Sequence, residues 1–211
     1  GGIHRGFTPP SSGALKILNF GEGLDDSGLD LDAEKSWNKE LGVRGTISLV
    51  EYEIAGFHID IENLVAAGRG TAFKNLGKVA SQGVEARMGI TLSQISSLLP
   101  NVHVAYTFLS TEVKEGIIIS NVPGSFGSEV SIEGKEMPYS PNHTVTAGIE
   151  FTPISDLKLR ADFRFVSEAY TDFENIKDTD ENGVYGPIPE YSIFNISGSY
   201  LISENFKLFF S

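Results

Sequence analysis

Strict alternation of apolar and polar residues is the pattern that most constrains this chain, and it dominates from about residue 39 onward. Because successive side chains of a β-strand point to opposite faces, the alternation predicts strands with one apolar face and one polar face. Apolar residues at helical spacing are scarce. We therefore expect an all-β, antiparallel fold built from about eight strands.

The apolar face of the predicted strands carries no charged residue, although 21% of the chain is charged. In chain order, the eight sets of apolar positions are Leu41, Val43, Gly45, Ile47 and Leu49; Ala55, Phe57, Ile59 and Ile61; Val84, Ala86, Met88, Ile90 and Leu92; Val102, Val104, Tyr106 and Phe108; Val145, Ala147, Ile149 and Phe151; Leu157, Leu159, Ala161, Phe163 and Phe165; Phe194, Ile196, Gly198 and Tyr200; and Phe206, Leu208 and Phe210.

The charged residues occupy the intervening positions, which are Glu40, Arg44, Asp60, Glu62, Glu85, Arg87, Glu150, Lys158, Arg160, Asp162, Arg164 and Lys207. Such segregation is typical of a transmembrane β-barrel, where a Lys or Arg facing mid-bilayer lipid costs about 2–4 kcal/mol. A mean hydropathy of −0.06 fits a chain of this kind. No apolar run approaches the roughly 20 residues that a membrane-spanning helix needs.

The connections between the predicted strands alternate in length. Short links at about 51–54, 93–100, 152–156 and 201–204 alternate with long ones at about 63–80, 112–141 and 170–190. Outer-membrane barrels have short periplasmic turns on one rim and long extracellular loops on the other. We therefore expect an extracellular loop region and strand approach at 1–38, followed by transmembrane strands, periplasmic turns and extracellular loops at 39–211.

Composition and motifs argue against several other functions. A net charge of −12 disfavours a nucleic-acid partner, which would need clustered cations. The absence of cysteine excludes disulfides and thiolate metal sites. No nucleophile elbow, zinc-binding helix motif or phosphate-cradling loop is present, so we expect no enzyme activity and no cofactor. The start at Gly1, without Met or leader, indicates a mature N-terminus or an internal cut.

Several segments resemble TonB-dependent receptors, especially those similar to ferric citrate receptors. They are GIHRGFTPPS at 2–11, EKSWNKELGVR at 34–44, FHIDIEN at 57–63 with NLG at 75–77 and GVE at 83–85, MPYSPNH at 137–143, and IPEYSIFN at 188–195. The chain departs from the family pattern in lacking the plug, the TonB box and the early strands. It also lacks the Asn-Leu-Phe-Asp motif and terminal strand expected after NFKLFF at 205–210.

The resemblance implies a plugged barrel of roughly 22 strands in the bacterial outer membrane, of which this chain would supply about eight late strands. It further implies import of an iron chelate such as ferric citrate or another siderophore. The implied partners are the chelate, the lipid bilayer and, through the plug region that is missing here, the TonB energy-coupling complex.

Basic residues at inward positions are the candidate ligand contacts. Arg44, Arg87, Arg160 and Arg164, with Lys158, could line a path for an anionic chelate. The alternative is that they pair with carboxylates of the wall or plug, such as Asp162 and Glu85. His4 and Arg5, in the loop that carries the resemblance, are further candidate contacts.

Acidic residues give two further candidate sites. Asp60 and Glu62 lie two apart and so would share the inward face, as an acid/base pair or, in the alternative, as solvated wall charges. Asp178, Asp180 and Asn182 match the first half of a calcium loop, but the twelfth position is Pro189 rather than the closing Glu. The alternative is an exposed acidic loop that binds no ion.

Two other folds stay open at this stage. A complete eight-stranded barrel with a structural or adhesive role would pair its first strand with its last. A soluble carbohydrate-binding β-sandwich would bury its apolar faces, including Val104, Ile149 and Phe163, beneath a second sheet.

Overall fold

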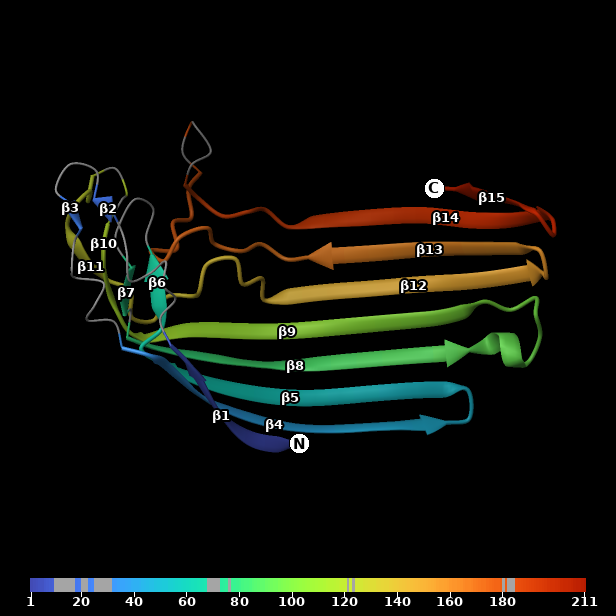
Figure 1. The fold of residues 1–211 in the computed structure, drawn as a ribbon, viewed down its shortest axis with the longest axis horizontal. Helices are drawn as coiled ribbons and strands as arrows, with labels where there is room; N and C mark the ends of the chain where they lie inside the picture. The colour runs from blue at the N-terminus through green and yellow to red at the C-terminus, as the bar shows by residue number, and fades with distance from the viewer. Residues whose placement is uncertain are drawn as a thin grey trace.

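A single antiparallel sheet of nine strands forms the body of the molecule in the computed structural model (Figure 1). The structure describes residues 1–9, 18–19, 23–24, 32–67, 73–75, 77–120, 122, 124–179, 181 and 185–211. The strands, in sheet order, are β1 (Gly2–Thr8), β4 (Glu34–Ile47), β5 (Val50–Glu62), β8 (Lys78–Thr91), β9 (Asn101–Glu115), β12 (His143–Ile154), β13 (Leu157–Val166), β14 (Tyr191–Ser203) and β15 (Phe206–Phe210). The prediction of an all-β antiparallel fold is confirmed.

Three small hairpins accompany this sheet in the described ranges. They pair β2 (Leu18–Asn19) with β3 (Gly23–Leu24), β6 (Val65–Ala67) with β7 (Phe73–Asn75), and β10 (Ile117–Ile119) with β11 (Glu129–Ser131). All three lie at one end of the long strands (Figure 1). Within the described residues, no helix has the length and hydrophobicity needed to cross a membrane.

The two ends of the sheet differ in the length of their connections. At the turn end, residues 48–49, 155–156 and 204–205 join neighbouring strands, and a longer turn with a 3-10 helix at Leu92–Gln94 joins β8 to β9. The other end, the loop end, carries the long connections (Figure 1). The predicted link at 51–54 is displaced: those residues lie within β5, and the chain reverses at Ser48, whose φ of 55° suits a tight turn.

The register divides the side chains of the sheet between two faces. Val43 pairs with Ile54, Ile54 with Ala86 and Ala86 with Tyr106, so these side chains share one face, here called the apolar face. Arg44 pairs with Glu53 and Glu53 with Arg87 on the opposite face, here called the polar face. The predicted segregation of apolar and charged residues therefore holds across neighbouring strands.

One predicted strand phase is wrong, at β5. Ala55, Phe57, Ile59 and Ile61 were expected to share the face of Leu41, but Leu41 pairs with Gly56, which places that set on the polar face. Asp60 and Glu62 consequently lie on the apolar face, near its loop end, rather than on the inward face. The cause is that the apolar residues of β5 change face along the strand: up to Ile54 they lie on the apolar face, whereas from Ala55 to Ile61 they lie on the polar face.

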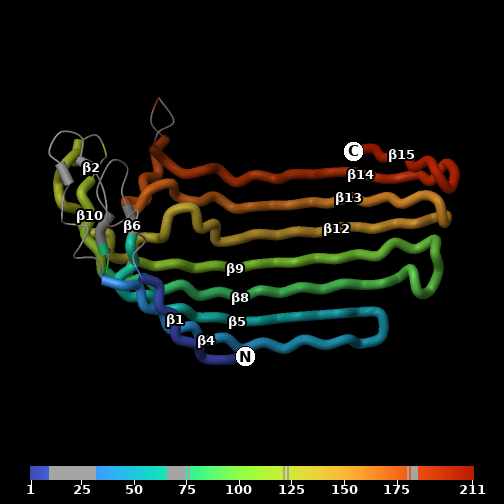
Figure 2. The backbone as a smooth tube through the Cα atoms, viewed as in Figure 1, coloured from blue at the N-terminus to red at the C-terminus, as the bar shows by residue number. Residues whose placement is uncertain are grey.

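Neither alternative fold agrees with the sheet. No second sheet covers the apolar face in the described part of the chain, where Ile149 is 45% exposed and Phe163 38% exposed. This excludes the sandwich interior. β1 and β15 are the two edges of the sheet and do not pair with each other, as the backbone trace in Figure 2 shows, so the strands form an open sheet rather than a closed small barrel.

The range 1–38, expected to hold an extracellular loop region and a strand approach, also contains a strand of the large sheet. β1 lies within that range and pairs along its whole length with the first half of β4, which itself begins at Glu34. The short β1 sequence, with Gly2 and Gly6, lacks the apolar alternation that marks the other strands. Its pairing depends on the backbone edge that β4 offers.

The buried core lies at the loop end, on the polar face. Val79, Val113 and Ile132 are at most 3% exposed, and Ile61, Leu64, Ile118, Met137 and Phe173 pack against them. Ile61, Val79 and Val113 form one cross-strand row of the sheet, whereas Ile132 comes from the long connection between β9 and β12. The loops therefore fold over the polar face and bury its last row.

Hydrogen bonds join two of the long connections, between β9 and β12 and between β13 and β14, to each other. The buried Ser120 hydroxyl donates to Glu174 Oε1 at 2.8 Å. Asn175 accepts from the Glu136 amide at 2.6 Å and donates to the Glu136 carbonyl at 2.9 Å. These contacts link residues 117–142 to residues 170–188, so the two connections behave as one packed unit above the sheet.

The substitution Ile132→Ala tests this loop core. Removing a fully buried Ile side chain should cost about 2–5 kcal/mol in the local stability of the loop unit. Hydrogen exchange followed by mass spectrometry should show faster exchange of the amides at 113 and 132–137. Ile117→Ala, at a position 59% exposed in the same hairpin region, is the matched control and should leave exchange unchanged; equal effects would contradict a buried loop core.

Candidate functional site

A belt of alternating charges crosses the polar face in the half nearer the turn end. Glu53 on β5 lies between Arg44 on β4 and Arg87 on β8, in one cross-strand row. Side chains paired directly across strands lie close enough for opposite charges to stabilise each other. The sign of the charge therefore alternates along the row, which leaves cationic groups at both sides of a single carboxylate.

A cavity of about 620 Å³ opens at this row. It is lined by the side chains of Arg44, Glu53 and Arg87 and, from the next row toward the turn end, by Glu51 and His103. Two guanidinium groups that border one cavity can each grip a carboxylate or similar anion through parallel hydrogen bonds. The chemistry of this site is therefore that of anion binding.

His103 extends the belt toward β13 across a glycine. The row runs from Gly89 to His103, Gly148 and Asp162, on β8, β9, β12 and β13. A Cβ atom at Gly148 would collide with the His103 imidazole and would lie 2.9 Å from Asp162 Oδ1. Because Gly148 has no side chain, His103 Nε2 lies 3.9 Å from Asp162 Oδ1 across the intervening strand.

Arg160 completes the belt with two carboxylates. Its guanidinium donates to Asp162 through Nε at 2.6 Å and Nη2 at 2.8 Å, and to Glu150 Oε1 through Nη1 at 2.8 Å. A second cavity, of about 860 Å³, is lined by Glu150, Lys158, Arg160 and the hydroxyl-bearing Ser197 and Ser199. This part of the belt is charge-balanced, and its exposed polar groups suit contact with another polar protein surface or a solvated ligand.

Four of the predicted basic residues divide between these two regions. Arg44 and Arg87 lie together at the first cavity, whereas Arg160 and Lys158 lie at the second. Arg164 lies in the row of Arg87 but is separated from it by Ala105 and Thr146. The alternative to ligand binding was that these cations pair with carboxylates of the barrel wall. Arg160 makes such contacts, and Asp162 is one of its partners. Ligand binding at these residues stays a prediction.

His4 and Arg5 lie on opposite faces of β1, as neighbours on a strand must. His4 pairs with Asn38 on the polar face, whereas Arg5 pairs with Trp37 on the apolar face. The Arg5 guanidinium carbon lies 5.6 Å from the centre of the Trp37 ring, a cation–π contact. The two residues therefore cannot form one joint contact to a ligand within β1.

The calcium loop stays a prediction. Asp180 and Asn182 lie outside the described residues, and Asp178 is exposed. Among the residues that the structure does describe, no group of three or more His, Asp or Glu side chains is arranged to hold a metal ion.

Sequence reasoning missed three members of the belt: Glu53, His103 and Gly148. Glu53 could have been found from the hairpin, because a two-residue turn at 48–49 places it directly opposite Arg44. The roles of His103 and Gly148 depend on which residues of β9, β12 and β13 face one another. No local pattern carries that information.

Comparisons with known proteins agree on one fold. The family described as TonB dependent receptor-like, beta-barrel, matches residues 1–211. The unliganded ferric citrate transporter FecA is 21% identical with a TM-score of 0.59, over 80% of this chain and 23% of that one. The ferric yersiniabactin uptake receptor FyuA from Yersinia pestis is 17% identical with a TM-score of 0.65, over 96% and 27%.

A third solved structure, the copper transporter OprC, is 11% identical with a TM-score of 0.63, over 96% of this chain and 28% of that one. The chain therefore spans about a quarter of the length of the solved structures that it matches. At these identities the likeness shows the fold.

The substitution Gly148→Ala tests the contact between His103 and Asp162. The added methyl group should displace the imidazole and shift the His103 ring resonances in NMR spectra of selectively labelled protein. Gly89→Ala is a matched control in the same row, because a Cβ there meets nothing within 4 Å. Similar shifts in both variants, or none in either, would contradict the proposed geometry.

Proposed function

Because the chain belongs to the TonB-dependent receptor-like β-barrel family, we propose that it forms part of the wall of an outer-membrane receptor that imports an iron chelate. The family is one of transport receptors rather than enzymes, and its barrels lie in the outer membrane. The observation that carries the proposal is the family match over the whole chain, joined to a sheet with one apolar face and one charged face.

The dimensions of the apolar face support contact with lipid. On β13 it runs from Leu157 to Phe165, a rise of roughly 26 Å along the strand, which is about 20 Å along the membrane normal at the tilt of about 35–45° that barrel strands have. Outer-membrane barrels carry an apolar band about 25 Å tall on their outer surface. The polar face would then line the interior of the barrel, where its charge belt meets the ligand path or the plug.

The charge belt supports an anionic metal chelate as the substrate. Arg44 and Arg87 border one cavity with donors that suit the carboxylates of a citrate-like complex. FecA and FyuA are named for ferric citrate and ferric yersiniabactin, whereas OprC is named for copper. We propose an iron chelate as the substrate. Copper is the competing substrate that the uptake experiment below can identify instead. Energy would come from the TonB complex acting on a plug that fills the barrel.

The orientation of the sheet is tested by the substitution Ile149→Lys. A Lys near the middle of the lipid-facing band should destabilise the folded barrel by about 2–4 kcal/mol. Denaturant titration in phosphatidylcholine vesicles, read from the electrophoretic mobility of folded and unfolded protein, would measure the cost. Thr146→Lys, on the polar face of the same strand, should destabilise the barrel much less. A larger destabilisation by Thr146→Lys than by Ile149→Lys would contradict the proposal that the apolar face contacts lipid.

The substrate is tested by uptake of radioactive iron supplied as ferric citrate and as other siderophore complexes to iron-starved cells. Uptake should require both the native protein and a working TonB complex. Arg44→Gln and Arg87→Gln should each weaken binding of an anionic chelate by about tenfold or more, since a hydrogen bond to a charged group contributes about 1.5–3 kcal/mol.

Glu53→Gln is the control for this test, because it removes a charge of opposite sign from the same cavity and should not reduce uptake. TonB-dependent uptake of copper with no uptake of any iron complex would replace the proposed substrate. Equal losses in all three variants would contradict anion binding at this cavity.

A further inference from the structure

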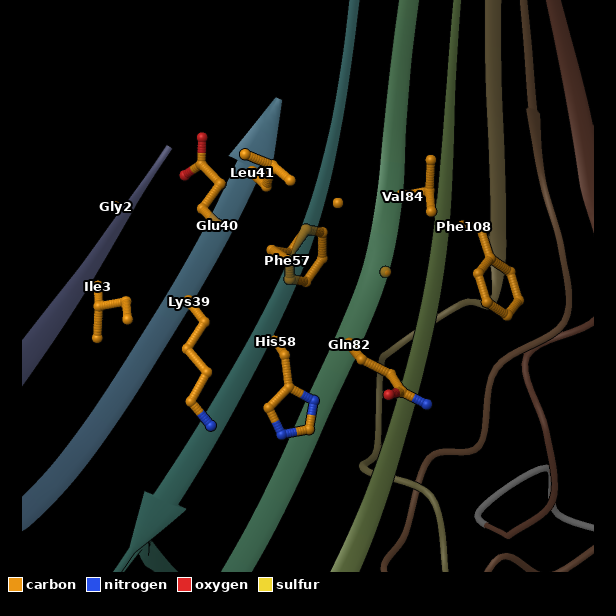
Figure 3. Close-up of a pocket in the computed structure, with 12 residues that line it drawn as sticks. Gly2, Ile3, Lys39, Glu40, Leu41, Phe57, His58, Gln82, Val84 and Phe108 are labelled. Carbon is orange, nitrogen blue, oxygen red and sulfur yellow. The ribbon is translucent and has the colours of Figure 1, made fainter. Parts of the chain in front are cut away.

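The apolar face has a sharp boundary on the side of the loops. On β4 and β8 the apolar alternation ends with Leu41 and Val84, which lie in one cross-strand row. Two residues further toward the loops, the same face carries Lys39, His58 and Gln82, side by side on β4, β5 and β8 (Figure 3). A Lys that faces the middle of a bilayer is strongly destabilising. The lipid-facing band therefore cannot extend past this boundary toward the loops.

The apolar face of the β8–β9 hairpin is shorter than the band that a barrel presents to lipid. Val84 to Ile90 on β8 rises roughly 20 Å along the strand, and Phe108 to Val102 on β9 pairs with it residue by residue. At a tilt of about 35–45° that rise is about 15 Å along the membrane normal. Outer-membrane barrels carry an apolar band about 25 Å tall. About 10 Å of the band therefore lies beyond the row of Ile90 and Val102, at the turn end.

The turn that follows this row, at residues 92–100, is uncharged and exposes apolar side chains. From Met88 to Val102 the sequence has no Asp, Glu, Lys or Arg. Ile95 is 65% exposed and Leu98 is 68% exposed, so both side chains meet whatever surrounds the turn end. The two-residue turns at 155–156 and 204–205 each carry an acidic residue instead, which suits contact with water. The turn at 92–100 therefore differs from these two turns in chemistry as well as in length.

Hydrogen bonds within the turn satisfy the amides of its apolar residues. The Ile95 amide donates to the Leu92 carbonyl at 2.9 Å. Leu98 donates to the Ser96 hydroxyl at 3.2 Å, and Leu99 donates to the Ser96 carbonyl at 2.9 Å. An unpaired backbone N–H is costly in hydrocarbon, where no water can replace the missing partner. Because these amides are already paired, the apolar residues of the turn can meet acyl chains without leaving their own donors unsatisfied.

We propose that the turn at 92–100 is inserted in the inner leaflet of the outer membrane, with Ile95 and Leu98 in contact with phospholipid acyl chains. The occupant is lipid because the turn continues the apolar face of β8 and β9 without an intervening charge, and because the band needs an extension at the turn end. The turn thereby fixes the depth of the β8–β9 hairpin in the bilayer. The proposal rests on the lipid-facing orientation of the apolar face and is independent of the imported substrate.

Spin labelling of the whole native protein, in vesicles of phosphatidylethanolamine and phosphatidylglycerol, tests the proposal. The chain has no cysteine, so Ile95→Cys and Leu98→Cys each provide one labelling position once any cysteine elsewhere in the protein is replaced by serine. Oxygen concentrates among acyl chains and a neutral nickel chelate in water, so power saturation reports the medium around each label. Oxygen should relax both labels more strongly than the chelate does. Val104→Cys, on the apolar face, is the lipid reference, and Asp156→Cys, at a two-residue turn, is the water reference.

The references separate this inference from the orientation of the sheet. A label at Val104 in lipid, with labels at Ile95 and Leu98 in water, would overturn the insertion of the turn alone. A label at Val104 in water would overturn the orientation and the insertion together. Labels at Ile95 and Leu98 that neither reagent reaches would place the turn against protein, and would also overturn its contact with lipid. In the labelled Ile95→Cys protein, Leu98→Asp should shift the label toward water, because the added charge must stay hydrated, whereas Leu98→Phe should keep it in lipid.

Discussion

An unbroken antiparallel ladder from β1 to β15 is the constraint on which the other features of the sheet depend. In hydrocarbon, backbone N–H and C=O groups have no water to bond, so every strand within the bilayer must be paired on both sides. A slip of one residue in any pairing would exchange the two faces of the strands beyond it. The irregularities of register lie near strand ends, at Lys78, after Phe151 and after Leu201.

How far the fold follows from sequence depends on whether the information is local. Alternation along a strand is local, so the apolar-face residues of β4, β8, β9 and β12 to β15 could be predicted. The phase of β5 could not, because Ile54 and Phe57 offer apolar residues to both faces, and the choice is made by pairing with β4 through the turn at Ser48. β1 could not be predicted for a related reason. Its sequence lacks the apolar alternation, and it forms a strand because it pairs with β4.

The charge belt shows the same division between local and cross-strand information. Arg44 and Arg87 are visible in the sequence as inward cations, but the carboxylate between them is set by the register. In the sequence, nothing distinguishes Gly148 from the other glycines. Its role follows from the sheet, which places it against the His103 ring. Electrostatic sites built across strands thus combine residues far apart in the chain, which alternation alone cannot connect.

The two faces of the sheet exchange polarity at the same height, and this explains why β5 is hard to phase. On the apolar face, Val84 is followed toward the loops by Gln82; on the polar face, Arg87 and Glu85 give way to Val79, next to Ile61 of β5. In the proposed orientation, the outer surface above the bilayer meets water and headgroups, while the inner surface meets packed loops. Each face therefore requires the opposite residue type above this level. A strand that passes through the level must carry its apolar residues on the outer face below it and on the inner face above it.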